Sequence, residues 1–284
     1  MAEKAYADSE KKRQKDIQKR AKKTIKDHKR GRDESGELSF SERPRMYVID
    51  FQGDIQASGV AGLRREVSAI LEVAGEGDRV LLRLENSGGY VHTHGLAASQ
   101  LKRLTDASVE LWVAVDQVAA SGGYLMACVA DKVCAAPFSI IGSIGVIAQM
   151  PNVNRLLKRY DIDVELHTAG KYKRTLTPLG ENTEEGRQKF IEDLNTTHQI
   201  FKDFVLRARP SLNIEEVATG ETWLGTQAVT VGLVDEVTTS DELILKALDE
   251  FEVYELSFET KRKLSERFLS AAHSLLAGRL PTQL

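Results

Sequence analysis

Short apolar runs alternate with segments of helical periodicity through the middle of the chain. Four runs are rich in β-branched and other apolar residues, as expected for buried strands, and they lie at 46–51, 80–84, 111–115 and 132–136. Between the first two runs, apolar residues recur at helical spacing at Leu63, Val67, Ile70 and Leu71. A second helix is expected around 96–104. Strands that alternate with crossover helices predict an α/β fold with a mainly parallel sheet.

Further along the chain the pattern changes. Two more short strands are expected at 144–147 and 164–168. One long amphipathic helix follows, which a capping box of Asn182 and Glu185 would begin and the pair Arg209-Pro210 would end. Beyond about residue 240 the sequence predicts a helix, an alternating strand-like segment and a final amphipathic helix.

Charge divides the chain into unlike parts. Residues 1–32 carry thirteen Lys or Arg and five Asp or Glu, so this segment has a net charge of +8 in a chain whose net charge is −3. We expect a basic arm and linker at 1–44, a folded domain at 45–240 and a C-terminal extension at 241–284. The arm is compatible with a solvated segment or with binding to an anionic membrane surface. Nucleic-acid binding is not expected, because no aromatic residue interleaves the basic ones after Tyr6.

The sequence predicts neither a signal peptide nor a membrane span. Charged residues follow Met1 without an apolar core, and no uninterrupted apolar stretch reaches about 20 residues. Cys128 and Cys134 both lie in apolar surroundings, and two cysteines do not make a disulfide framework. We expect both to be buried thiols.

The candidate chemistry lies in the stretch from Val115 to Cys128. An apolar run leads into small residues, then Ser121-Gly122-Gly123, then helix-forming residues, which predicts a strand, a tight turn and a helix. A serine at such a corner lies beside the free N–H groups of the helix start, where negative charge is stabilised. Ser121 is therefore a candidate acyl-transfer nucleophile. The alternative is that it only caps the helix.

The tetrapeptide Ser-Gly-Gly-Tyr occurs twice, at 87–90 and at 121–124. Ser87 follows the polar pair Glu85-Asn86, which is typical of a turn whose glycines let a backbone N–H approach a ligand. Ser121 instead follows two alanines, which help to exclude water. We therefore expect Ser121 to be the nucleophile, and the glycine turn with the Gly122 amide to form an oxyanion hole.

A base for this serine is less evident. His92 and His94 lack a third ligand at a spacing typical of metal sites and are expected to be ordinary polar residues, while His167 is a distant candidate base. A lysine between Thr168 and Thr175 could accept the proton if it were neutral, because burial lowers the pKa of an ammonium group. An ordinary surface lysine is the alternative. We expect no cofactor and no metal.

Four segments resemble the signal peptide peptidase A family of Ser/Lys proteases, and within it the SohB-type membrane peptidases. These segments are VAASGGYLMACVAD, APFSIIGSIGVIAQMPN, AGKYKRTLTPLGENTEEG and ATGETWLGTQAVTVGLVDE. The resemblance covers about residues 46–247 and implies that Ser121 is the nucleophile and Lys173 the general base. It also implies that Ser143 hydrogen-bonds the lysine, and that Gly89 and Gly122 form the oxyanion hole.

One departure from the family pattern lies in the first glycine turn. The family commonly has Ser-Pro-Gly-Gly there, whereas this chain has Asn86-Ser87-Gly88-Gly89. The loss of proline predicts a less rigid turn and a less preorganised oxyanion hole.

The resemblance also implies a fold, an assembly and a location. The fold is the Clp protease and crotonase type, a spiral of β-β-α units, in homo-oligomers whose sites are assembled with neighbouring protomers. The location is the inner membrane, to which family members are tethered by an N-terminal anchor, with the site on its outer, periplasmic face. The basic arm instead favours the cytoplasmic side.

The predicted function is that of a serine endopeptidase acting on peptides or membrane-protein fragments such as signal peptides. Two alternatives remain open at this point: a crotonase-like enzyme that binds an acyl-CoA thioester, and a membrane-associated scaffold without catalysis. Binding of acyl-CoA would favour the first alternative. Failure of a serine-directed probe to label Ser121 would favour the second.

Overall fold

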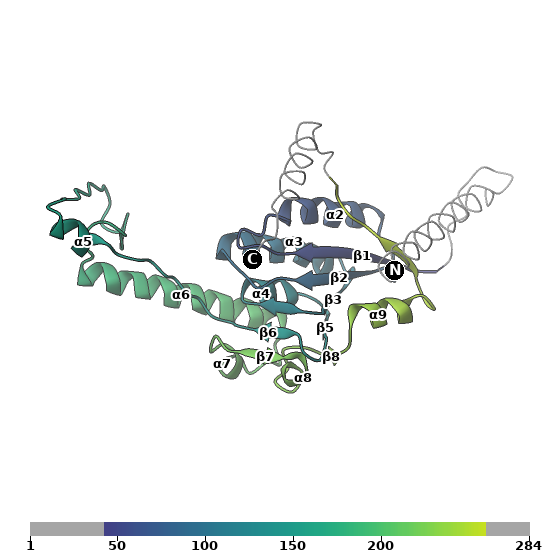
Figure 1. The fold of residues 1–284 in the computed structure, drawn as a ribbon. Coiled ribbons are helices and arrows are strands. Elements are labelled where there is room, and N and C mark those ends of the chain that lie inside the picture. Colours follow the sequence, from purple (N-terminus) through teal and green to yellow (C-terminus); the bar gives the residue numbers. More distant parts are fainter. Residues whose placement is uncertain (1–42, 260–284) are drawn as a thin grey trace, which may run out of the picture. The chain divides into compact units, whose positions relative to one another are not determined.

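The computed structural model describes residues 43–259 and arranges them around two β-sheets (Figure 1). The larger sheet has the order β8-β5-β3-β2-β1-β9 with every pairing parallel, and the smaller has the order β4-β6-β7. The strands are β1 Arg45–Gln52, β2 Arg79–Glu85, β3 Glu110–Val115, β4 Val118–Ala120, β5 Lys132–Ala135, β6 Ile140–Gly142, β7 Thr222–Leu224, β8 Glu236–Val237 and β9 Glu252–Glu255. The helices are α2 Val60–Val73, α3 Val91–Asp106, α4 Gly122–Ala127, α5 Asn154–Arg159, α6 Glu184–Ala208, α7 Ile214–Val217, α8 Gly225–Ala228 and α9 Ser240–Ala247.

Apolar side chains cover both faces of the larger sheet. Along β1, Tyr47, Ile49 and Phe51 join a core shared with α2, α3 and α4, while Met46 and Val48 join a smaller cluster with α9. Because both faces are buried, the strands are nearly continuous apolar runs rather than alternating ones. The predicted α/β fold with a mainly parallel sheet is therefore confirmed.

The strand expected to lead into Ser121 is in fact two strands in different sheets. β3 ends at Val115 in the larger sheet, and β4 begins at Val118 in the smaller one. Between them, the Asp116 carboxylate accepts hydrogen bonds from the backbone N–H and the hydroxyl of Ser240 at 2.9 and 2.5 Å. β5 and β6 divide between the sheets in the same way. This arrangement confirms the predicted spiral of β-β-α units.

Two predicted strands are wrong. Residues 144–147 form no strand, since β6 ends at Gly142, whose φ angle is +104°, and the following residue, Ser143, has a φ angle of +51°. Positive φ angles cannot continue a strand. Residues 164–168 are exposed and pair with no strand among the described residues. Val164 and Leu166 alternate with polar residues, as in a strand, but no strand among residues 43–259 pairs with this segment.

The long helix α6 begins one residue later than its predicted cap. Thr183 is the N-cap residue, and its hydroxyl accepts a hydrogen bond from the N–H of Gly186 at 3.1 Å. The Asn182 side chain instead accepts the N–H of Thr177 at 2.8 Å, so it orders the preceding loop. The helix ends before Arg209-Pro210, as the sequence predicts.

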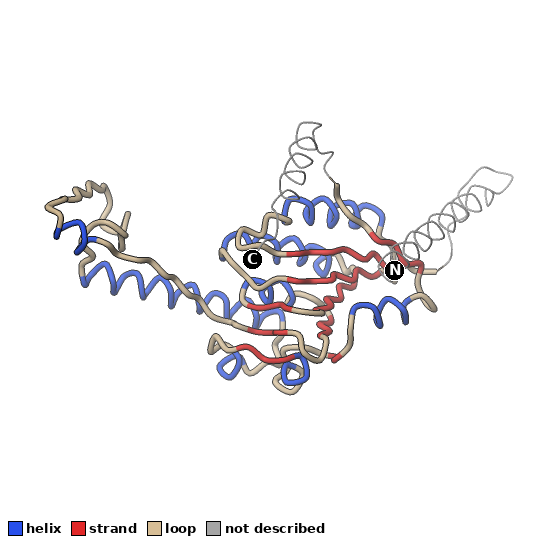
Figure 2. Tube along the Cα trace, viewed as in Figure 1, coloured by secondary structure: helices blue, strands red, loops and turns tan. Residues whose placement is uncertain are grey.

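The connection between β6 and α6 is mostly loop and mostly exposed (Figure 2). It contains α5, and it contacts α6 at both ends, since His198 of α6 lies 3.2 Å from the carbonyl oxygen of Ile144 and Glu185 of α6 pairs with Lys171. Only Phe201 and Val205 of α6 are buried. The strand expected in the tail is present as β9, whereas the expected final amphipathic helix lies outside the described residues. Within residues 43–259 no helix has both the length and the apolar character that crossing a bilayer requires.

Candidate active site

Ser121 occupies a sharp corner between β4 and α4. Its φ and ψ angles are +52° and −118°, a conformation that non-glycine residues adopt rarely and that is concentrated at functional sites. Although Ser121 is the N-cap residue of α4, its side chain makes no capping hydrogen bond. The helix-cap alternative is therefore not supported, and the half-buried hydroxyl is left for other chemistry.

The first glycine turn packs directly against this corner. Gly88 has a φ of +93°, and a Cβ atom placed there would lie 2.7 Å from the Cβ of Ser121 and 2.9 Å from the nitrogen of Gly122. Only glycine allows this approach and this φ angle together. Asn86 brings the turn to its place through a parallel bridge with Ala119 of β4. The two Ser-Gly-Gly-Tyr segments thus meet, with Ser87 exposed and Ser121 half-buried.

A pocket of about 300 Å³ opens beside Ser121. Gly89, Ser121 and Gly122 contribute to its wall, and the rest is mainly apolar, with Val91, Leu125, Val146, Ile200, Phe201 and Phe204. Gly122 is the first residue of α4, so its N–H has no partner within the helix. The N–H of Gly89 donates to no atom among the described residues. The pocket therefore combines a hydroxyl and two N–H groups with an apolar wall.

Ser143 lies at the same end of the smaller sheet as Ser121. β4 and β6 pair in parallel with Ala120 opposite Gly142, so the next residue of each strand is one of these serines. Both have positive φ angles, and Ser143 is half-buried. The fold thus places Ser121 and Ser143, two of the site residues that the resemblance implies, at the same end of the smaller sheet.

Lys173 is not brought to this pocket by its own chain. Its side chain is exposed, and residues on either side of it bind the start of α6: Lys171 pairs with Glu185 at 2.7 Å, and Thr175 contacts Gly186. The pocket is lined instead by the other end of α6, at Ile200, Phe201 and Phe204. At 1.5 Å per residue, the 14 residues from 186 to 200 separate the two ends by about 20 Å. Figure 1 shows α5 beside the first end of α6 and α4 beside the second.

No titratable side chain among the described residues lines the Ser121 pocket. His167 is exposed, and its Nε2 lies 3.3 Å from a carboxylate oxygen of Glu165. His92 is exposed and stacks on Tyr90. In the part of the chain that the structure describes, no group of His, Cys, Asp and Glu residues is arranged to hold a metal.

Two residues at the site have roles that sequence reasoning did not assign. Asn86 is 1% exposed and His94 is 0% exposed, and they contact each other beneath the glycine turn. The sequence predicts a turn residue at Asn86 and an ordinary polar residue at His94. In the sequence, these two polar residues are notable only because they lie on either side of the glycine turn. That position does not reveal that their side chains are buried.

The cysteine prediction is confirmed. Cys128 and Cys134 are free and buried, and burial raises the pKa of the Cys128 thiol to about 12 and that of Cys134 to about 11. Thiols with such values are inert at neutral pH. Neither cysteine competes with Ser121 as a nucleophile.

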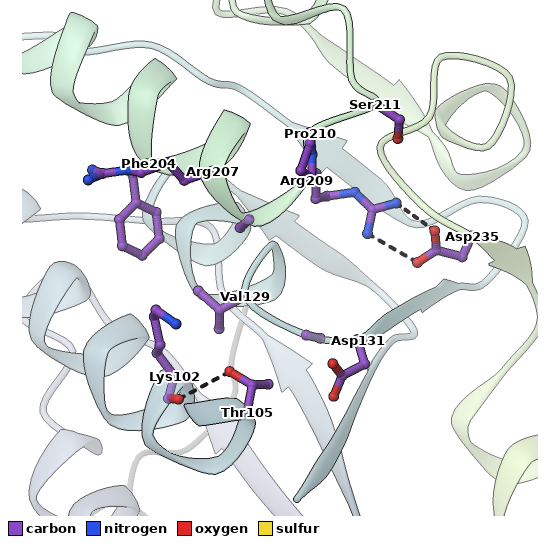
Figure 3. A pocket seen from close by; sticks show the side chains of 12 residues that line it. Lys102, Thr105, Val129, Asp131, Phe204, Arg207, Arg209, Pro210, Ser211 and Asp235 are labelled. Atoms are coloured by element: carbon purple, nitrogen blue, oxygen red, sulfur yellow. Dashed lines mark hydrogen bonds and ion pairs between the residues drawn. The ribbon is translucent and has the colours of Figure 1, made fainter. Parts of the chain in front are cut away.

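A second pocket, of about 630 Å³, lies at the C-terminal end of α6 (Figure 3). Its charged groups are engaged in structural contacts. Arg209 donates to both carboxylate oxygens of Asp235 at 2.6 and 3.1 Å, and Asp131 accepts the N–H of Leu111. Lys102 pairs with Asp106. None of the predicted site residues lines this pocket.

Comparison with known proteins identifies the relatives of the chain. A family model described as "Peptidase family S49" matches residues 103–254, and one described as "Peptidase family S49 N-terminal" matches residues 1–101. "Probable protease SohB" of Haemophilus influenzae is 56% identical over 231 residues, which cover 81% of this chain and 65% of that protein. "Probable protease SohB" of Buchnera aphidicola subsp. Acyrthosiphon pisum is 53% identical, covering 84% of this chain and 71% of that protein. The chain thus spans slightly less than two thirds of the Haemophilus protein.

More distant similarity extends to other proteins. A "Putative signal peptide peptidase SppA" of Enterococcus faecium is 28% identical over 58% of this chain and 48% of its own length. A variant of the membrane-bound stomatin-specific protease 1510-N has a TM-score of 0.49 and 13% identity, covering 77% of this chain and 100% of that one. A ClpP1 variant from Listeria monocytogenes has a TM-score of 0.43 and 11% identity, covering 70% and 93%. On the strength of the two family models, the chain belongs to peptidase family S49.

Proposed function

We propose that this protein is a serine endopeptidase in which Ser121 is the nucleophile and Lys173 of a neighbouring copy is the general base. One observation carries the proposal: the pocket holds a strained serine and two N–H groups without acceptors, but no titratable group of its own chain among the described residues. Membership of a peptidase family supports the reaction class. The separation of about 20 Å along α6 supports a base supplied by another protomer.

In the proposed reaction, the neutral Lys173 amine removes the proton from the Ser121 hydroxyl as its oxygen attacks a peptide carbonyl. The Gly89 and Gly122 N–H groups donate to the oxyanion that forms. Lys173 then returns the proton to the leaving amine, and a water molecule repeats the sequence on the acyl-enzyme. Ser143 orients the lysine, as a third group orients the base in other serine hydrolases. Since the amine must be neutral, the rate rises toward alkaline pH.

The proposed substrate is an extended peptide with an apolar side chain at the cleaved bond. The six large apolar residues of the pocket wall favour such a side chain, and the absence of charge from the wall disfavours an ionised one. Signal peptides and fragments of membrane proteins have this character. We therefore place them within the substrate class.

A homo-oligomer follows from the proposed base and from the exposed apolar surface. Ile147 is 89% exposed, and Tyr160, Leu166, Tyr172 and Ile191 are each about half exposed or more. All of them lie in the β6–α6 connection or on α6. Apolar residues gathered on one segment are typical of an interface. If these apolar side chains were buried against a second copy, Lys173, which lies in the same connection, would be placed near the Ser121 of that copy.

The decisive experiment combines two inactive variants. Ser121→Ala and Lys173→Ala should each abolish hydrolysis of an apolar fluorogenic peptide, whereas Ser87→Ala and Lys171→Ala should keep most of it. If the base comes from another protomer, co-assembled Ser121→Ala and Lys173→Ala chains regain about a quarter of the wild-type rate, as random mixing around a closed ring predicts. Absence of recovery in a verified mixed oligomer rejects the shared site. Activity in Ser121→Ala alone rejects the nucleophile.

The location at the inner membrane, with the site on the periplasmic face, is part of the same proposal. Resemblance supports both the membrane and the periplasmic face, whereas the basic character of residues 1–32 supports only contact with an anionic membrane surface. Sedimentation of the purified chain with anionic vesicles, compared with neutral ones, tests the basic segment as a membrane-binding element. Equal sedimentation with both vesicle types would reject that role.

A further inference from the structure

The glycine turn that carries Gly89 is held by a buried pair of polar side chains. The Asn86 amide oxygen accepts a hydrogen bond from the N–H of Gly88 at 2.8 Å and lies 3.2 Å from Nε2 of His94. The Asn86 amide nitrogen faces the sulfur of Met126 at 3.3 Å. Since these side chains are withdrawn from water, breaking either contact leaves a buried polar group without a partner.

The Gly88 contact fixes the chemistry of the pair. Because a backbone N–H points at one end of the Asn86 amide, that end must be the carbonyl oxygen, which only accepts. The His94 nitrogen that faces the same oxygen must therefore carry a proton and donate it. The other ring nitrogen, Nδ1, lies 3.0 Å from the carbonyl oxygen of Tyr90, the N-cap residue of α3.

His94 also contacts the second half of the oxyanion hole. A Cβ atom placed on Gly122 would lie 2.5 Å from Cγ of His94, so the ring packs on the Cα of the residue whose N–H is to bind the oxyanion. Through Asn86 the same ring holds the turn before Gly89. The His94 side chain therefore sets the positions of both N–H groups, those of Gly89 and Gly122, that line the pocket with Ser121.

We propose that His94, acting through Asn86, is the positioning residue of the oxyanion hole in this chain. The inference rests on the proposed peptidase function. It also explains how the turn tolerates Ser87 where the family commonly has proline: the order that a proline ring would supply comes from a buried hydrogen bond instead. His94 touches no reacting atom, so its effect is on geometry.

Three substitutions at His94 separate the hydrogen bond from Nε2 to Asn86 from the contact that Nδ1 makes with Tyr90. His94→Gln can place an amide N–H near the Nε2 position and keep the bond to Asn86. His94→Asn can reach only the Nδ1 position and keeps the contact with Tyr90, while His94→Phe fills the volume and keeps neither. We expect His94→Gln to stay within about threefold of the wild-type kcat, and the other two to fall by about tenfold or more with KM nearly unchanged.

A second measurement does not depend on activity. Amide hydrogen exchange across residues 86–90 should accelerate at least about tenfold in His94→Asn and His94→Phe and stay near the wild-type rate in His94→Gln. If the wild type hydrolyses peptides but all three variants keep its kcat and exchange rates, the positioning role is rejected while the peptidase function stands. If the wild type hydrolyses nothing, the peptidase function fails. The ranking of amide exchange rates among the wild type and the three variants then decides by itself whether His94 holds the turn. If His94→Gln and His94→Asn change kcat and the exchange rates equally, the inference is overturned. Thermal melts identify any variant that has not folded.

Discussion

The backbone N–H of Ser121 donates a hydrogen bond to the carbonyl oxygen of Gly142 at 2.8 Å. This bond extends the β4–β6 pairing one step beyond Ala120, so the corner that displays the candidate nucleophile is held by the neighbouring strand. Gly142 itself has a φ of +104°. The position of Ser121 thus depends on a second unusual backbone conformation, which only glycine adopts at low cost.

Gly142→Ala should therefore disturb both stability and reactivity. The new Cβ atom would lie 2.7 Å from the ring of Trp223, and the φ angle would be strained in alanine. We expect a loss of about 2 kcal/mol or more in the free energy of unfolding, and slower labelling of Ser121 by a fluorophosphonate. Urea unfolding and labelling rates measure the two effects. Gly62→Ala in α2 is the control, because a Cβ there meets only ordinary contacts at 3.9 Å or more and lies outside the Ser121 pocket, so labelling should not change and stability should gain up to about 0.5–1 kcal/mol.

The Arg209–Asp235 pair makes stability depend on acid pH. Burial would raise the pKa of Asp235, but the hydrogen bonds from Arg209 and from the N–H of Val133 hold that pKa below its usual value. A carboxylate with a lowered pKa stabilises the fold above its unfolded pKa of about 4, and this stabilisation is lost as pH falls through the folded value. Because the side chain is 36% exposed, we expect Asp235→Asn to cost only about 1–2 kcal/mol at pH 7.

The difference in unfolding free energy between the wild type and Asp235→Asn should shrink as pH falls from about 5 to about 2.5, because the wild-type carboxylate takes up its proton in this range. Urea unfolding across this range measures it. Asp249→Asn, at an exposed site, should stay within about 0.5 kcal/mol of the wild type. A difference that is the same at pH 7 and pH 3 would contradict the linkage.

Glu66 on α2 affects stability in the opposite direction to Asp235, because its ionised carboxylate destabilises the folded state. Burial raises the pKa of its carboxyl group by more than the hydrogen bond from the N–H of Phe258 lowers it. The ionised form therefore destabilises the fold at neutral pH. Glu66→Gln keeps an acceptor for Phe258 and should have a higher free energy of unfolding than the wild type at pH 7. The gain should vanish below about pH 4, where the carboxyl is protonated in both states. Glu72→Gln, exposed on the same helix, should show no gain.

The sequence predicted the four central strands of the larger sheet, β1, β2, β3 and β5, and the corner at Ser121, because both depend on local pattern. Apolar runs such as 80–84 are buried on both faces, and Ser-Gly-Gly between a strand and a helix leaves few other conformations. The role of His94 could not be predicted in this way. It depends on how α3 packs against α4, which brings His94 onto Gly122, and periodicity alone does not specify that contact.

The connection between β6 and α6 was the least predictable segment for a different physical reason. Residues 164–168 alternate between apolar and polar side chains, but all five are exposed, and none of the strands within residues 43–259 pairs with them. A pattern of burial identifies a strand only when the chain itself supplies the covering surface. In the proposed oligomer, a second copy would provide such a surface for residues 164–168.

Ile147→Asp should separate assembly from folding. In the single chain Ile147 is 89% exposed, so the substitution should leave the monomer's unfolding free energy unchanged within about 0.5 kcal/mol. If a second copy buries this side chain, losing about 2 kcal/mol per contact weakens the oligomer by about thirtyfold, and the introduced charge adds to the loss. Analytical ultracentrifugation should then show dissociation, together with slower fluorophosphonate labelling of Ser121 at the same protein concentration. Gln149→Asp adds the same charge at an exposed site two residues away and should change neither. An Ile147→Asp protein that stays assembled and active would place the subunit interface on another face.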